Sequence, residues 1–494
     1  MHEILQLLFL ITFFALGTAD QSHEVSRPTS INIEPCEVPG ARPNTKEKVR
    51  CGTYEVFENR TAMSGRTIKL KIVVFPATGE NPAPDPVFYI AGGPGSSATE
   101  EAPFIAQEWS KIRERRDLVF VDQRGTGGSN PLNCELYDPK NINSYLGSYF
   151  PLDDVRRCRQ QVESIADLRF YGTHVAMDDL EEARVALGYK QINIGAVSYG
   201  TRAALIYLKR RPSSVRAMLL QGALPTNQSM PRDFPQNTER AINGILDDCL
   251  ADKECSAAFP NVRTDAKAVL QRLISGPVEV DVKDAKGTAT RIKLSRDLAA
   301  ETIRYMLYSP TGAGRVPLFL HLAATGNFTP LAESALMFRR RLATGANGMY
   351  LAVTCSEDLP WIKRGEGERD ADKTFLGNYR LHQQRAACEI WPRAEVPRDF
   401  HKSTRANTNV LILTGQWDPV TPPIYGDIAA KNLPNSLHVV VPNGGHGFGG
   451  LDGLSCIQDL NARFIESGSV RGLDTSCVKN IRRRAFLLKM PENR

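Results

Sequence analysis

INIGAVSYGTR, residues 192–202, is the most informative stretch of the chain. Its first six residues are mostly apolar and predict a buried strand, and the residues that follow predict a helix. Ser198 lies at the junction among small residues, which places its hydroxyl at the apex of a sharp strand-to-helix turn, as for a catalytic nucleophile. An N-capping serine gives a similar pattern. Because Ala196 stands where such turns usually have glycine, this stretch alone leaves both interpretations open.

Short apolar runs on both sides of this stretch predict further buried strands, each followed by a glycine-rich or polar loop. Buried strands that alternate with helical patterns are typical of an α/β fold with a mostly parallel sheet and helices on both faces. Ligands bind beyond the carboxyl ends of such strands. The predicted strands are 52–58 and 67–75, which form an antiparallel pair, and 87–90, 118–121, 192–197, 216–220, 410–413 and 437–441.

The chain has 494 residues, more than the about 250–300 at which a single core stops growing. Residues 233–400 interrupt the series of strands and have mainly helical patterns. We therefore expect a core in two parts, residues 51–232 and 401–494, with residues 233–400 inserted as a helical lid over the strand ends. Residues 20–50 are polar and contain proline, which predicts an extended arm.

Two residues at the ends of the last predicted strands supply the base and the orienting acid that a nucleophilic serine needs. Asp418 follows the strand at 410–413, and His446 lies between glycines after the final strand. The chain order of serine, acid and histidine is that of the α/β-hydrolases. His438 and His401 are the competing bases, but neither lies at a strand end in this way.

An oxyanion hole requires two backbone N–H groups near the nucleophile. One is expected from Tyr199, directly after Ser198. The other is expected from Gly93 in the loop at 91–95, because α/β-hydrolases take their second donor from the loop after an earlier strand. A simple glycine–proline turn is the alternative for this loop.

These motifs together resemble the prolyl aminopeptidase and tripeptidyl aminopeptidase branch of the α/β-hydrolases, over roughly residues 50–480. The motifs are AGGPG at 91–95, DQRG at 122–125, VSYGTR at 197–202, GQWDPVTPP at 415–423 and GGHG at 444–447. The stretch from Cys456 to Cys477 is similar to the C-terminal segment of tripeptidyl aminopeptidase-like proteins. The chain departs from the family at Ala91, usually histidine, and at Ala196. Neither residue transfers protons, so we expect activity to be retained.

The resemblance implies a peptidase that releases proline or short peptides, such as tripeptides, from peptides with a free N-terminus. An α-ammonium group would need an anionic partner, for which Glu357 and Asp358 are the candidates, with an exposed acidic loop as the alternative. Arg124 is expected to brace the site through hydrogen bonds. A carboxylesterase or lipase would use the same triad, and a non-catalytic binding protein is the third alternative.

The N-terminus predicts a signal peptide. Residues 4–16 are almost entirely apolar, and the small residues that follow fit cleavage after Ala19, although the segment before the apolar run has no Lys or Arg. An uncleaved anchor or a buried helix are the alternatives, but the run is short for a membrane span. We therefore expect a secreted or periplasmic protein with no stable membrane insertion after cleavage.

The ten cysteines also favour export, because disulfides persist in oxidising compartments. Pairing of neighbours along the chain is one hypothesis for their connectivity, and ten buried thiols are the alternative. The hypothetical pairs are Cys36/Cys51, Cys134/Cys158, Cys249/Cys255, Cys355/Cys388 and Cys456/Cys477.

Composition argues against other classes of ligand. No Cys/His cluster has zinc-ligand spacing, and no dinucleotide-binding glycine motif opens a helix, so neither a metal nor another cofactor is expected. The formal net charge of +6 is small for this length, and no basic cluster is interleaved with aromatic residues. Nucleic acid is therefore not expected as a partner.

Overall fold

The computed structural model describes residues 31–283, 289–369 and 371–491. The predicted signal segment lies outside these ranges. The core is a nine-stranded sheet in the order β1-β2-β3-β5-β4-β6-β7-β10-β11. The strands from β5 to β11 in that order pair parallel, and β1, β2 and β3 add an antiparallel edge. The strands are β1 Glu34–Pro39, β2 Lys46–Phe57, β3 Thr67–Phe75, β4 Val87–Ile90, β5 Leu118–Val121, β6 Ile192–Val197, β7 Val215–Gln221, β10 Asn409–Gly415 and β11 Ser436–Val441.

The predicted parallel sheet is confirmed, and four of its strands have the expected bounds. The N-terminal edge differs, because β2 begins at Lys46 and pairs with an additional strand, β1. The expected arm over residues 20–50 therefore contains an edge strand, and the expected boundary at residue 51 falls within β2. The residues of β1 are exposed or half-buried and include two glutamates, so β1 lacks the apolar run that identifies buried strands.

Side chains alternate between the two faces of the sheet, as the two-residue period of a strand requires. In β4, Val87 and Tyr89 pack in one hydrophobic core with α1 and α16, whereas Phe88 and Ile90 pack in the other with α4 and α5. The sheet is thus covered on both faces, which explains its almost wholly apolar central strands. The covering helices are α1 Ala98–Glu108, α4 Thr173–Ala186, α5 Tyr199–Arg210, α15 Pro423–Ala430 and α16 Ser455–Ser467.

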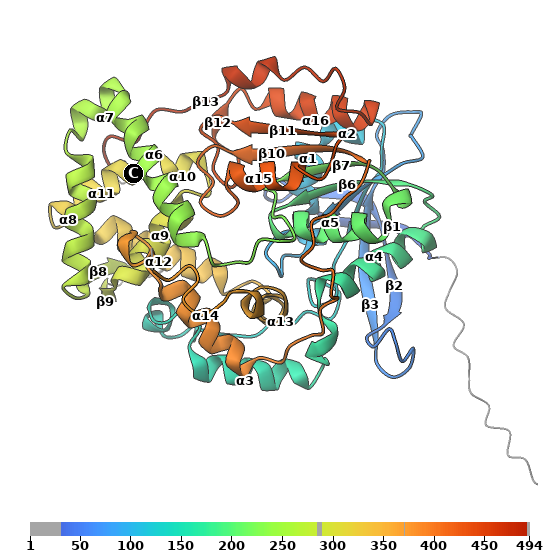
Figure 1. Ribbon diagram of the computed structural model, residues 1–494, viewed down its shortest axis with the longest axis horizontal. Helices are drawn as coiled ribbons and strands as arrows, with labels where there is room; N and C mark the ends of the chain where they lie inside the picture. Colours follow the sequence, from blue (N-terminus) through green and yellow to red (C-terminus); the bar gives the residue numbers. More distant parts are fainter. Residues whose placement is uncertain (1–30, 284–288, 370, 492–494) are drawn as a thin grey trace, which may run out of the picture.

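The segment between β7 and β10, hereafter the cap, is mainly helical and also contains an antiparallel hairpin of β8 and β9. Figure 1 shows most of its helices on one side of the sheet, at the left of the view. The hairpin was not predicted, although the apolar/charged alternation of Val278–Lys283 is a strand signal. The cap elements are α6 Phe234–Ala251, α7 Lys253–Ala258, α8 Val262–Ile274, β8 Val278–Lys283, β9 Ala289–Leu294, α9 Arg296–Met306, α10 Pro310–Ala313, α11 Val316–Ala324, α12 Thr329–Leu342, α13 Asn347–Glu357 and α14 Tyr379–Ile390.

A second segment, between β5 and α4, also packs against the cap. Its helix α3, Leu152–Glu163, contacts α13 and α14, and its short helix η1, Ile142–Leu146, contacts α12. Figure 1 shows α3 beside α14 at the lower edge of the molecule. The Cys134–Cys158 disulfide closes this segment on itself. This contribution to the cap was not predicted, because the segment precedes the nucleophile by some tens of residues in sequence.

Candidate active site

Ser198 lies in the sharp turn between β6 and α5. Its backbone has φ 56° and ψ −127°, a left-handed conformation that non-glycine residues rarely adopt and that concentrates at functional sites. Neighbouring backbone is very close, since a Cβ on Gly200 would lie 2.3 Å from the carbonyl oxygen of Ile90. Only glycine therefore fits at position 200.

The structure explains why glycine stands at 195 and alanine at 196. A Cβ on Gly195 would lie 2.0 Å from the indole ring of Trp109, so the tight packing falls on the α1 face of the sheet. Ala196 faces the opposite core, where its methyl group is buried. The missing elbow glycine is thus replaced by a residue whose side chain has a place in the core.

Asp418 and His446 form a hydrogen-bonded pair at the ends of β10 and β11. His446 Nδ1 lies 2.8 Å from Asp418 Oδ2. The fully buried carboxylate also accepts hydrogen bonds from the amides of Val420 and Thr421, at 2.7 and 2.9 Å, and from the Thr421 hydroxyl. Burial opposes ionisation of Asp418, but the adjacent His446 and these hydrogen bonds outweigh it and lower its pKa below the usual value.

The cap contacts the histidine loop directly. The amide of Gly447 donates to the carbonyl oxygen of Tyr308 at 2.7 Å, and the Tyr308 ring packs edge-on against the His446 ring with centroids 5.0 Å apart. The position of the imidazole is therefore set from both sides, by Asp418 in the core and by Tyr308 in the cap.

Ser198 and His446 line one cavity of about 670 Å³ between the sheet and the cap, a volume in the range of pockets for small ligands. No hydrogen bond joins Ser198 Oγ to the His446 ring in the described part of the chain. Such bonds commonly tighten only when substrate is present. The competing bases lie elsewhere: His438 contacts Asp427 and Thr414, and His401 packs on Trp361.

The glycine loop that follows β4 borders the nucleophile. A Cβ on Gly92 would lie 3.2 Å from the Cβ of Ser198, and Gly93 has φ +107°. The loop is anchored by Asp122 of the DQRG motif, which accepts hydrogen bonds from the Ser97 hydroxyl at 2.8 Å and the Thr99 amide at 2.9 Å. The motif at 122–125 thus holds the start of α1 and, with it, the candidate oxyanion loop.

Glu357 and Asp358 do not reach the cavity, which corrects the expectation that they bind an α-ammonium group. Both are buried at the end of α13. Asp358 Oδ1 lies 2.8 Å from Arg202 of α5, and Glu357 accepts hydrogen bonds from the Thr173 amide and hydroxyl. The sequence around them suggested a loop, but the α13 helix instead directs these acids into the contact between cap and nucleophile helix.

Arg124 is also fully buried and is absent from the cavity lining. Its guanidinium binds both carboxylate oxygens of Asp179 on α4 and donates to backbone carbonyl oxygens of Phe57, Glu58 and Phe170. Arg124 therefore braces β2, α4 and the DQRG loop against one another through hydrogen bonds.

The acids that do line the cavity are Glu100 and Glu101, in the first turn of α1. Glu101 Oε2 accepts a hydrogen bond from the Tyr89 hydroxyl at 2.6 Å. Sequence reasoning missed them, because acidic residues in the first turn of a helix normally interact with the helix dipole. Their position six and seven residues beyond Pro94 is the signal that could have identified them.

The structure forms five disulfides, in the pairs hypothesised from the sequence. The pairs are Cys36–Cys51, Cys134–Cys158, Cys249–Cys255, Cys355–Cys388 and Cys456–Cys477. Cys355–Cys388 joins α13 to α14 and so fixes two cap helices beside the cavity. In the described ranges, no group of three or more His, Cys, Asp or Glu residues is suited to hold a metal ion.

The Cys249–Cys255 disulfide lies within the cap and joins the end of α6 to α7. The sequence predicted this pair but not the helix α7 that contains Cys255. Asp252 caps α7, because its carboxylate accepts hydrogen bonds from the amides of Glu254 and Cys255 at 3.0 and 2.8 Å. Cys255 is fully buried and is absent from the lining of the cavity beside Ser198. The Cys249–Cys255 disulfide therefore has a structural role, in which it holds the turn between two cap helices.

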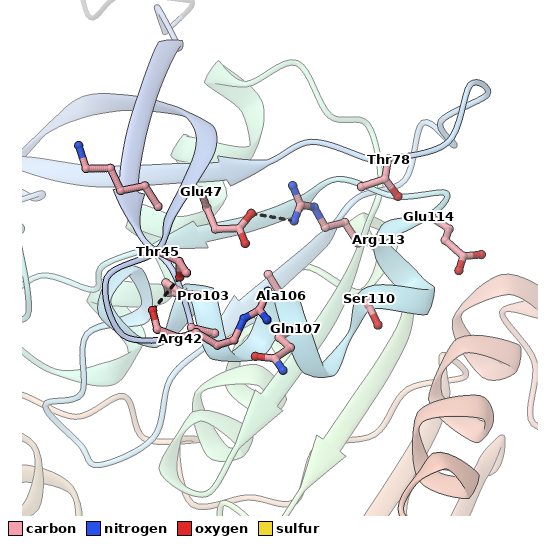
Figure 2. Close-up of a pocket in the computed structure, with 12 residues that line it drawn as sticks. Arg42, Thr45, Glu47, Thr78, Pro103, Ala106, Gln107, Ser110, Arg113 and Glu114 are labelled. Carbon is pink, nitrogen blue, oxygen red and sulfur yellow. Dashed lines mark hydrogen bonds and ion pairs between the residues drawn. The ribbon is translucent and has the colours of Figure 1, made fainter.

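A second hollow, of about 630 Å³, lies between α1 and the turn that joins β1 to β2 (Figure 2). An ion pair between Glu47 and Arg113, at 3.6 Å, spans part of it. Its lining includes Ser110 but no histidine. This hollow therefore lacks a serine and base pair, unlike the cavity beside Ser198.

Comparison with known proteins agrees with this geometry. The family described as alpha/beta hydrolase fold matches residues 85–252, which contain the glycine loop and Ser198. The family described as TAP-like protein matches residues 373–477, which contain Asp418 and His446.

Three curated relatives match most of the chain. The putative hydrolase YuaR of Escherichia coli K12 is 25% identical over 77% of each chain. Serine protease Hip1 of Mycobacterium tuberculosis H37Rv is 24% identical over 86% of this chain and 87% of its own. Tripeptidyl aminopeptidase of Streptomyces coelicolor is 22% identical over 88% of this chain and 84% of its own. The chain is thus a serine hydrolase with the α/β-hydrolase fold, and it is similar to TAP-like proteins.

Proposed function

We propose that this protein is an exported serine aminopeptidase that releases short peptides from the N-termini of peptide substrates. The observation that carries the proposal is the convergence of Ser198, in a strained turn, and the Asp418–His446 pair on one cavity. This arrangement supports acyl transfer, in which a serine attacks a carbonyl carbon with help from a base.

In the proposed mechanism, Asp418 holds His446 through Nδ1, which leaves Nε2 to take the proton of Ser198 as the hydroxyl attacks the peptide carbonyl. The amides of Tyr199 and Gly93 stabilise the oxyanion. His446 then protonates the leaving amine, and water hydrolyses the acyl-enzyme by the same route. The lowered pKa of Asp418 supports its role, because an ionised carboxylate stabilises the imidazolium.

Glu101 replaces Glu357 and Asp358 as the proposed partner of the substrate α-ammonium group. Its carboxylate lines the cavity and is oriented by the Tyr89 hydroxyl. Because Glu101 lies in the same helix turn that follows the oxyanion loop, it would hold the N-terminus at a fixed distance from the scissile bond. A fixed distance is what separates an aminopeptidase from an endopeptidase.

Export is proposed from the predicted signal segment and the five disulfides. Among the described helices, none combines the length and apolar character that a membrane span requires. We also propose that residues 233–400 act as the lid of the cleft. The two parts of the core then precede and follow this segment in the sequence.

The proposal is tested with Ala-Ala-Ala-p-nitroanilide, its N-acetylated form and p-nitrophenyl acetate. We expect turnover of the free tripeptide amide, a loss of at least about tenfold in kcat/KM on acetylation, since an ionic hydrogen bond is lost, and a similar loss in Glu101→Gln. Ser198→Ala should abolish turnover, whereas Ser110→Ala, an exposed control outside the cavity, should not. Ester turnover without amide turnover would instead identify an esterase.

A further inference from the structure

Arg380, the second residue of α14, is a buried cation in the wall of the cavity that Ser198 lines. It is only 3% exposed. Aromatic rings surround its guanidinium: the carbon Cζ lies 3.5 Å from the ring centroid of Tyr149, 5.2 Å from that of Phe150 and 5.6 Å from that of Tyr350. These three residues also line the cavity.

The guanidinium uses few of its donors. Its Nη2 donates to the Tyr350 hydroxyl at 2.8 Å, and Nε and Nη1 are buried with no hydrogen-bond partner among the described residues. A buried donor without a partner costs about 1–3 kcal/mol, and more when it is charged. Such a group calls for an explanation, and a bound acceptor is one that fits a cation in a cavity wall.

The acid whose charge acts on Arg380 already forms an ion pair with another arginine. Glu301 of α9 binds Arg304 through both carboxylate oxygens, at 2.6 and 2.9 Å. Within the described ranges, no other carboxylate hydrogen-bonds either guanidinium. Two buried cations thus share one buried anion, which leaves this wall of the cavity with a net positive charge.

We propose that Arg380 forms a subsite that binds a carboxylate of the peptide substrate. The proposal rests on the proposed peptidase function and specifies its substrate class. The aromatic rings exclude water and hold the guanidinium plane, and a carboxylate would supply both the missing charge and the acceptor atoms. Its source is either an acidic side chain or the C-terminal carboxylate of a short peptide, because both present the same group.

The first experiment compares matched substrates with wild-type protein. Glu and Gln are placed in turn at each position of Ala-Ala-Ala-p-nitroanilide, and the tetrapeptide Ala-Ala-Ala-Ala is compared as free acid and as C-terminal amide. We expect the carboxylate member of at least one pair to be favoured by about tenfold or more in kcat/KM, since charge-assisted hydrogen bonds are the strong ones. A Glu/Gln pair identifies a side chain, and the acid/amide pair identifies a C-terminus. Equal rates in every pair would overturn the proposal.

Variants then locate the effect. Arg380→Gln should bring the kcat/KM ratio of the favoured pair to near one, and Arg380→Lys, which keeps the charge, should retain part of the preference. Arg340→Gln removes an exposed charge on α12 outside the cavity lining and should leave the ratio unchanged. A preference that persists in Arg380→Gln would assign the carboxylate to another residue.

A binding measurement separates this proposal from the peptidase proposal. Labelling of wild-type protein by a fluorophosphonate should be slowed by glutarate but not by glutaramide. This selectivity should be reduced in Arg380→Lys and absent in Arg380→Gln. Absence of any peptide turnover would contradict the peptidase function alone. Equal protection by the acid and the amide would contradict the carboxylate subsite.

Discussion

Asp358→Asn removes the charge that neutralises Arg202 beneath the nucleophile. The Arg202 guanidinium and the Asp358 carboxylate are 2.8 Å apart, and both side chains are almost fully buried. Removing one partner of a buried pair costs about 3–5 kcal/mol, because the remaining charge stays unpaired in a medium of low dielectric. Asparagine still offers an oxygen to Arg202 and to the Met230 amide. We therefore expect the low end of this range, about 3 kcal/mol.

The expected change in melting temperature follows from the size of the chain. At about 2.1 cal/mol/K per residue, unfolding 494 residues has an entropy of about 1 kcal/mol/K. A loss of about 3 kcal/mol then lowers Tm by about 3 °C. Circular dichroism measures this shift, and the double variant Asp358→Asn/Arg202→Met should recover part of it, because the unpaired cation is gone.

Kinetics distinguish this structural role from substrate binding. Well below Tm, Asp358→Asn should change the KM for Ala-Ala-Ala-p-nitroanilide by less than about threefold, because Asp358 does not line the cavity. A rise in KM of about tenfold or more with an unchanged Tm is the result expected of a residue that binds the α-ammonium group. That result would refute the structural role of Asp358.

Three further predictions follow from individual contacts. Asp418→Asn should lower kcat by about 10³–10⁴-fold in steady-state assays of folded protein, because the histidine loses its orienting anion. Gly200→Ala should prevent formation of the active turn, since its Cβ would lie 2.3 Å from the Ile90 carbonyl oxygen, whereas the open position Gly147 should accept alanine with activity unchanged. Burial raises the pKa of Glu357 from 4.5 to about 7, so its contribution to stability is full below pH 4.5 and is lost as pH rises through about 7. In urea denaturation, Glu357→Gln should reduce the decline of the unfolding free energy with pH. A decline of equal size in the variant would contradict its attribution to Glu357.

The mostly parallel sheet could be predicted because its strands are nearly continuous apolar runs, such as Val87–Ile90 and Leu118–Val121, which are typical of a sheet covered on both faces. The edge strand β1 could not, because its exposed polar side chains have no such pattern. The hairpin of the cap had the alternation of a strand, but the helical patterns around it dominated the interpretation of that region.

The candidate triad could be predicted because its residues follow strands, and the carboxyl ends of parallel strands meet at one edge of the sheet. The specificity residues could not, because they depend on tertiary contacts. Asp358 is directed inward by Arg202 from another helix. Arg380 belongs to the cavity only because Tyr149 and Phe150, from the segment after β5, fold against the cap. No local pattern reports such a contact.

The central claim is that Ser198 is the nucleophile, and active-site labelling tests it most directly. The protein is treated with a fluorophosphonate, digested and examined by mass spectrometry. The account predicts one adduct, on Ser198, that is lost in His446→Ala although that variant remains folded by circular dichroism. An adduct on another residue, or a folded wild-type protein that takes no label, would contradict the account.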